Sequence, residues 1–153
     1  MFINSTNNQT ESELRNDFRP YDEQIRRMLG LLDGKERFSY SLWFVPDDAG
    51  WPDAPGYNED EHGREYLQSA GTADGMTVEL RRLEEDGQYH QYVVGKPGSE
   101  GQSLDREVKY DEYTLNVRPG EVFTADEATP IFYTYFQENT VPGGLVLREL
   151  DLT

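Results

Sequence analysis

The chain has 153 residues, the ordinary size of one domain, and carries 30 acidic against 14 basic residues, for a formal net charge of −16. A field of that sign repels nucleic-acid phosphates and anionic lipids, so we expect no direct binding to nucleic acid or a membrane; it favours a basic partner or serves solubility alone. Cysteine is absent, which excludes disulfides, thiolate metal sites and cysteine nucleophiles.

The apolar residues are few but unusually aromatic, with ten Tyr, seven Phe and two Trp. Disordered acidic chains are poor in aromatics, so this composition indicates a folded chain with a small, ring-rich core. We expect residues 1–10, which are polar and rich in asparagine, to form a flexible arm before a single α+β domain over residues 11–153. The chain begins with no basic segment followed by an apolar one, and no apolar run reaches the ~18 residues of a membrane span, so the expected location is the cytoplasm.

Helical signals occur in three places. Glu11–Phe18 is predicted to form a short helical turn, and Tyr21–Asp33 a longer helix whose apolar residues recur at helical spacing. Gly34 follows at the position where glycine commonly ends a helix. Thr124-Ala125-Asp126-Glu127 matches a capping box, in which the first and last side chains satisfy each other's backbone N–H groups, and predicts a helix over Ala125–Asn139.

Alternating apolar residues and turn signals predict several antiparallel strands, two of them joined by the hairpin turn Asp86-Gly87. The predicted strands are Phe38–Val45, Tyr66–Ala70, Met76–Leu83, Tyr89–Val94, Val108–Val117 and Leu145–Leu150. The predicted fold is therefore α+β, a single antiparallel sheet packed against two or three helices. The residues expected to be buried are Phe38, Tyr40, Leu42, Val78, Leu80, Phe132 and Phe136.

No motif in the chain indicates catalysis or metal binding. One of the two histidines, His62, follows Glu59-Asp60-Glu61 in a predicted loop, where adjacent side chains rarely converge on one ion. The other, His90, is expected on a hairpin strand as a surface or cross-strand partner. Nucleotide-binding, nucleophile-elbow and EF-hand motifs are also absent from the sequence, so we predict no metal, no cofactor and no enzyme activity.

The segment Pro46–Gly63 is the most unusual part of the sequence, a predicted long loop with six acids and no Lys or Arg. Its two aromatic residues are anchors of the kind that protein interfaces use, and its acids would steer a basic partner. The predicted partner-binding residues are Asp47, Asp48, Trp51, Asp53, Tyr57, Glu59, Asp60 and Glu61. The alternative interpretation is an acidic loop whose Trp51 packs onto the core. A second acidic cluster, Glu84–Asp86, is interpreted as a solvated hairpin tip.

Three stretches of the C-terminal third are Glu121–Ala128 (EVFTADEA), Ile131–Phe136 (IFYTYF) and Val141–Leu145 (VPGGL). Together they resemble small immunity proteins of bacterial polymorphic toxin systems, which are cytosolic inhibitors encoded beside secreted toxins. In such proteins a helix that flanks the sheet and a short turn with proline lead into the last strand. The resemblance implies a cognate toxin domain as partner, often a basic nuclease or deaminase, and implies no particular binding residues.

These observations favour an acidic binding protein, an immunity-type inhibitor that binds and blocks a basic toxin of the nuclease or deaminase class. Two alternatives remain open. One is a nucleic-acid mimic or adaptor that binds another basic protein, such as a phage-encoded inhibitor. The other is an enzyme of unfamiliar type that uses carboxylates and tyrosines.

Overall fold

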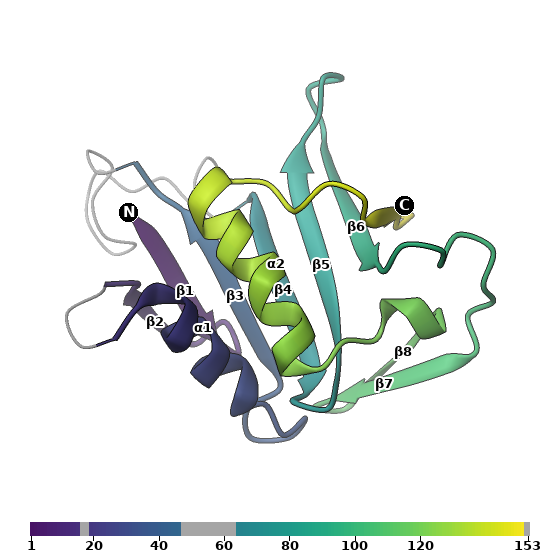
Figure 1. The fold of residues 1–153 in the computed structure, drawn as a ribbon, viewed down its shortest axis with the longest axis horizontal. Coiled ribbons are helices and arrows are strands. Elements are labelled where there is room, and N and C mark those ends of the chain that lie inside the picture. The colour runs from purple at the N-terminus through teal and green to yellow at the C-terminus, as the bar shows by residue number, and fades with distance from the viewer. Residues whose placement is uncertain (16–18, 47–63, 152–153) are drawn as a thin grey trace.

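The computed structural model describes residues 1–15, 19–46 and 64–151 (Figure 1). Its elements are β1 (Phe2–Thr6), β2 (Thr10–Glu13), α1 (Tyr21–Gly30), β3 (Ser39–Phe44), β4 (Tyr66–Thr72), β5 (Gly75–Leu83), β6 (Tyr89–Gly95), β7 (Arg106–Tyr110), β8 (Tyr113–Val117), the 3-10 turn η2 (Pro119–Glu121), α2 (Ala125–Glu138) and β9 (Val146–Glu149). The two longer predicted helices and most of the predicted strands are therefore present, with bounds that differ by a few residues.

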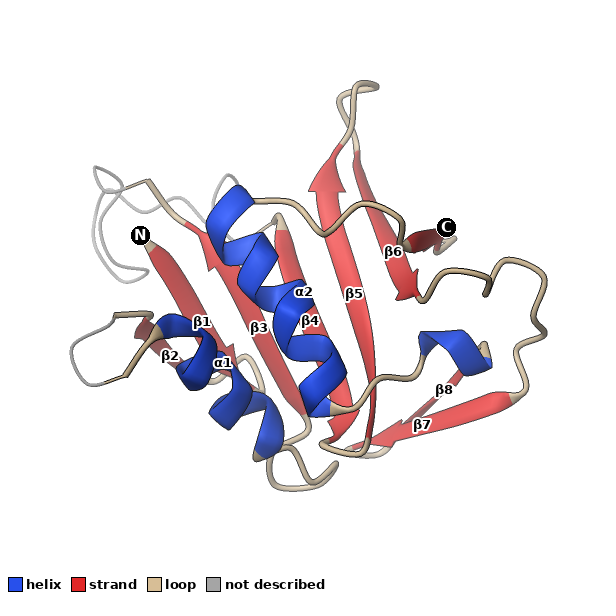
Figure 2. Cartoon of the chain, in the orientation of Figure 1, coloured by secondary structure: helices blue, strands red, loops and turns tan. Residues whose placement is uncertain are grey.

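Seven strands form one antiparallel sheet in the order β2-β1-β3-β4-β5-β6-β9, and α1 and α2 lie side by side across one of its faces (Figure 2). This confirms the α+β class. The predicted strand Val108–Val117 is wrong, because the chain folds back at Asp111, whose φ is 54°. Its halves, β7 and β8, pair only with each other, so a small second sheet accompanies the large one.

The N-terminal residues form a strand of the sheet, so the expectation of a flexible arm over residues 1–10 is wrong. The strand β1 lies inside the sheet between β2 and β3, and Ile3 is fully buried. The amino group of Met1 donates a hydrogen bond to the Val45 carbonyl at 2.8 Å. Thr10–Glu13 forms β2 where a helical turn was predicted, because these residues pair with β1.

Local bonds and backbone conformation explain where α2 begins and ends and where α1 ends. The predicted capping box is confirmed, since the Thr124 hydroxyl accepts from the Glu127 N–H at 3.2 Å and the Glu127 carboxylate accepts from the Thr124 N–H at 2.9 Å. Asn139, with a φ of 56°, ends α2 in the left-handed conformation. Helix α1 ends three residues earlier than predicted, because Asp33 begins a turn and accepts backbone N–H groups from residues 35 to 37.

The core lies between the sheet and α2. The rings of Phe132 and Tyr40 are 5.5 Å apart, and both side chains are inaccessible to solvent. Of the residues predicted to be buried, five are confirmed: Tyr40, Leu42, Val78, Leu80 and Phe132. Phe38 and Phe136 are half-buried instead, because Phe38 precedes β3 and Phe136 lies at the margin of the core.

Candidate protein-interaction site

All eight predicted partner-binding residues lie outside the described part of the chain, as does His62. They are Asp47, Asp48, Trp51, Asp53, Tyr57, Glu59, Asp60 and Glu61. The structure does fix where their segment is attached. It leaves the described chain at Pro46, after β3, and re-enters it at Arg64, before β4. Because β3 and β4 are antiparallel neighbours, both attachment points lie at one end of the sheet.

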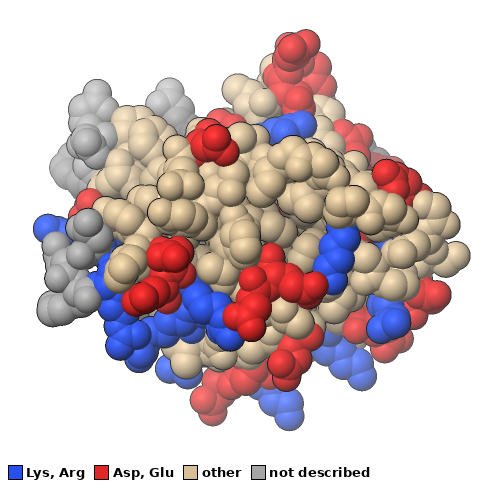
Figure 3. All heavy atoms as spheres, in the orientation of Figure 1, with Lys and Arg blue, Asp and Glu red and all other residues tan. Residues whose placement is uncertain are grey.

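The second acidic cluster lies at that same end. Strand β5 ends at Leu83 and β6 begins at Tyr89, and these two residues pair with each other. The Glu65 carboxylate accepts a hydrogen bond from the Leu83 N–H at 3.4 Å, which ties the start of β4 to the root of the hairpin. The hairpin tip Glu84–Asp86 therefore projects from the end of the sheet where residues 47–63 are attached, and its acids form the upper extremity of the surface in Figure 3.

One acid of the tip is held by its neighbours. The Glu84 carboxylate forms an ion pair with Arg82 and accepts a hydrogen bond from the Tyr92 hydroxyl at 2.9 Å. These two bonds, with the one from Arg82 first, lower the pKa of Glu84. The Arg82 guanidinium also lies 5.1 Å from the centre of the Tyr92 ring. Glu84 thus stiffens the hairpin, whereas Glu85 is exposed to solvent.

His90 is clamped between two carboxylates. Its Nε2 lies 2.6 Å from Asp86 Oδ2, and its Nδ1 lies 2.5 Å from Glu149 Oε1. Both ring nitrogens can donate only in the imidazolium form, and the bonds to Asp86 and then to Glu149 raise the pKa of His90. Neither nitrogen is free to accept a proton from a substrate, so this arrangement fastens the hairpin tip to β9 and does not make a general base.

Sequence reasoning missed this clamp. It interpreted His90 as a surface or cross-strand residue, and the strand residue opposite it is in fact Arg82. Asp86 is four positions away and gives a weak local signal. Glu149 is 59 positions away, and only the pairing of β9 with β6 brings it near.

A second group of charges surrounds Arg148 of β9. Arg148 donates two hydrogen bonds to the Glu121 carboxylate, at 2.9 Å and 3.0 Å, and Glu121 is fully buried. The same carboxylate accepts the Arg118 N–H at 2.8 Å and so closes the η2 turn. Nearby, burial raises the pKa of Glu79, and its carboxylate accepts from the Gln91 amide at 2.9 Å. Every oxygen of Glu121 is satisfied within the chain, which indicates a structural role.

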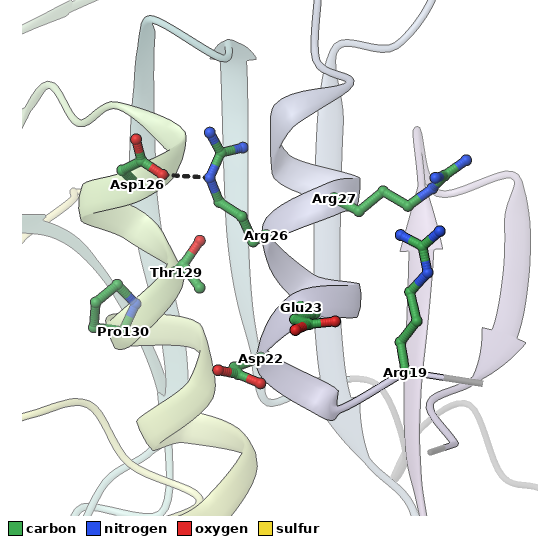
Figure 4. A pocket seen from close by; sticks show the side chains of 8 residues that line it. All are labelled: Arg19, Asp22, Glu23, Arg26, Arg27, Asp126, Thr129 and Pro130. Carbon is green, nitrogen blue, oxygen red and sulfur yellow. Dashed lines mark hydrogen bonds and ion pairs between the residues drawn. The ribbon is translucent and has the colours of Figure 1, made fainter. Parts of the chain in front are cut away.

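A groove of about 470 Å³ separates the two helices (Figure 4). Arg26 reaches across it to pair with Asp126, while Arg19 and Arg27 point to the other side of α1. The full lining is Arg19, Asp22, Glu23, Arg26, Arg27, Asp126, Thr129 and Pro130. Side chains of both charges line the groove, so it does not present a surface of one charge to a ligand.

Within residues 1–15, 19–46 and 64–151, the side chains of His, Asp and Glu nowhere gather in a group of three that could hold a metal ion. No helix in these ranges combines the length and the apolarity needed to cross a bilayer. Comparison of the chain with protein-family models and with curated proteins finds no match.

Proposed function

We propose that this protein is a non-catalytic, cytoplasmic binding protein, an immunity-type inhibitor that covers a basic toxin domain of the nuclease or deaminase class. The observation that supports the proposal is the position of its acids. The segment with six acids, residues 47–63, is attached at the end of the sheet from which the hairpin tip Glu84–Asp86 projects. The points where the acidic segment joins the described chain and the hairpin tip thus lie at the same end of the sheet.

Such an arrangement suits fast capture of a basic partner. Like charges gathered at one end produce a stronger local field than the same charges spread evenly, and that field orients a basic surface before contact. A net charge of −16 extends the attraction beyond the contact zone. The same field repels nucleic acid, which competes for the basic surface of a nuclease or deaminase.

The test is binding kinetics with the protein encoded by the neighbouring gene, purified as a catalytically inactive variant. We expect the association rate to fall steeply as salt rises, because the Debye length shrinks from ~10 Å at 0.1 M to ~3 Å at 1 M. We also expect stoichiometric inhibition of the active partner. Absence of binding, or an association rate insensitive to salt, would overturn the proposal, and binding without inhibition would favour an adaptor role.

Variants of the segment 47–63 sharpen this test. Reversing Asp47 and Asp48 to Lys should slow association, whereas Trp51→Ala and Tyr57→Ala should raise the dissociation rate, because a desolvated aromatic anchor is commonly worth ~2 kcal/mol or more. The matched control is Glu112→Lys. That exposed acid lies in the β7–β8 turn, where the N–H of its neighbour Asp111 donates to the Gly34 carbonyl at the opposite end of the sheet. An equal loss of rate per reversed charge in the control would mean that only net charge matters.

A further inference from the structure

Five aromatic rings from four different elements meet at the margin of the core, and we call them the aromatic patch: Phe2 (β1), Tyr21 (α1), Phe44 (β3), Tyr133 (α2) and Phe136 (α2). Phe2 joins two of them, with its ring centre 5.4 Å from that of Phe44 and 5.0 Å from that of Phe136. Phe136 in turn lies 4.3 Å from Tyr21 and 6.3 Å from Tyr133. The rings therefore form one continuous chain of contacts.

The aromatic patch is not part of the buried core. Phe44 is 45% exposed, and the other four rings are half-buried. The core rings Phe132 and Tyr40 are by contrast inaccessible. Each half-exposed ring keeps apolar surface in contact with water, which costs free energy that a bound partner would recover. Aromatic side chains are enriched in the buried centres of protein interfaces.

The surface beside the patch is almost free of charge. Between Ala128 and Leu147 the sequence has one charged residue, Glu138, in a chain where 29% of residues are charged. Figure 3 shows a broad uncharged surface over the middle of α2 and the segment that follows it, with red side chains near both ends of the helix. A partner could therefore approach these rings without desolvating many charges.

Acids border the patch. Asp22 and Glu23 follow Tyr21 and are exposed, and the exposed base Arg19 precedes it. Glu65, at the start of β4, lies close enough to Tyr135 to contribute to raising the pKa of that hydroxyl, although burial is the larger cause. An uncharged aromatic centre with acids beside it, on a chain of net charge −16, suits a surface that receives a basic protein.

We infer that the aromatic patch is the apolar centre of the partner-binding surface, and that its occupant is an uncharged, apolar projection of the basic partner flanked by Lys and Arg. This inference rests on the proposed function and specifies it. Steering by the acids sets how fast the complex forms, and burial of the rings sets how long it lasts.

The experiment measures binding of the neighbour-encoded protein to four single variants. Phe44→Ala and Tyr133→Ala remove rings from the patch, and Tyr113→Ala is the control, since that ring is 63% exposed on β8. Glu85→Lys changes an exposed acid of the hairpin tip. We expect the two patch variants to raise the dissociation rate about tenfold or more at an unchanged association rate, Tyr113→Ala to bind like wild type, and Glu85→Lys to lower the association rate alone.

The outcomes separate the inference from the proposed function. If Glu85→Lys slows association but both patch variants dissociate like wild type, the inference is overturned and the proposed function stands. If wild type does not bind at all, the proposed function fails, and the inference with it. Thermal melts of each variant show whether a loss reflects unfolding. Dimers of wild type in light scattering that Phe44→Ala converts to monomers would assign the patch to a second copy of this chain and overturn the inference.

Discussion

The same two strands, β5 and β6, pass through two regions held together by different forces. Beneath α2, Val78 and Leu80 of β5 belong to a core of uncharged side chains. Beyond the helices, the same hairpin is held by an ion pair between Arg82 and Glu84 and by the clamp of Asp86 and Glu149 on His90. One region is dry and the other is half-exposed.

The difference shows that one fold can combine a core stabilised by apolar burial with a hairpin end stabilised by exposed charges. Burial of apolar surface is insensitive to salt and to moderate pH changes, and it contributes about 25 cal/mol per Å². Exposed ion pairs contribute about 0–1 kcal/mol each and weaken with salt or on titration. The core should therefore set global stability, while the hairpin tip should respond to conditions locally. Four predictions test this division, from the largest effect to the smallest.

Phe132→Ala should destabilise the protein by about 3–5 kcal/mol, because it leaves a cavity between α2 and Tyr40 that neighbouring side chains fill only in part. Chemical denaturation with urea measures the free energy of unfolding. Leu104→Ala is the matched control, since Leu104 is an apolar residue that is 51% exposed, and it should change stability little. Similar losses in both variants would contradict the assignment of Phe132 to the stabilising core.

Arg148→Met should cost about 3 kcal/mol, although it replaces a charge with an apolar side chain of similar length. The cost arises because the fully buried Glu121 carboxylate loses the two hydrogen bonds of its partner. Arg82→Met removes the exposed pair with Glu84 and should cost under ~1 kcal/mol. Equal losses in the two variants, measured in the same denaturation experiment, would mean that burial does not distinguish these ion pairs.

Thr124→Ala should cost about 1 kcal/mol, because the Glu127 N–H at the start of α2 loses its acceptor. Thr124→Ser keeps the hydroxyl and should retain most of the stability. A Ser variant as unstable as the Ala variant would show that the threonine methyl group matters more than the capping bond.

Raising the pH should loosen the His90 clamp without unfolding the core. The folded-state pKa of His90 lies above its usual value of ~6.5, so the contribution of the clamp is complete below that pH and is lost as pH rises through the folded pKa. NMR titration of the imidazole measures this pKa. The local readout is amide-exchange protection at Leu150, whose N–H donates to the Gln91 carbonyl at 2.8 Å.

The control for this pH effect is His90→Gln, which should remove the pH dependence of protection at Leu150 while leaving protection at Val78 in the core unchanged. A His90 pKa at or below ~6.5 in wild type would contradict the clamp. Loss of protection at Val78 over the same pH range would contradict the separation of the two regions.

Sequence reasoning succeeded where the signal was local. The capping box at Thr124 and Glu127 predicted the start of α2 at the residue where it begins, and Asp86-Gly87 predicted the hairpin between β5 and β6. Alternation in β5 predicted the burial of Val78 and Leu80. These patterns depend on contacts within a few residues, which the chain order itself supplies.

For the candidate site, the sequence identified the acids but not their arrangement. It interpreted Glu84–Asp86 as a solvated hairpin tip, and only the pairing of β4 with β5 places this tip and the attachment points of residues 47–63 at one end of the sheet. It also predicted Phe136 as a core residue, whereas contacts with Phe2 and Tyr21 place it in the aromatic patch.

The sequence by itself determined the class of the fold, the start of α2, the main hairpin and the acidic character of the chain, because composition and short-range spacing encode these directly. Tertiary structure alone decided that polar residues 1–10 provide an inner strand, since Asn4 becomes buried by pairing with Leu42, 38 positions away. It likewise decided that His90 meets Glu149 and that five separate rings join. Each of these requires strands and helices distant in sequence to pack, and their contacts depend on the whole sheet having formed.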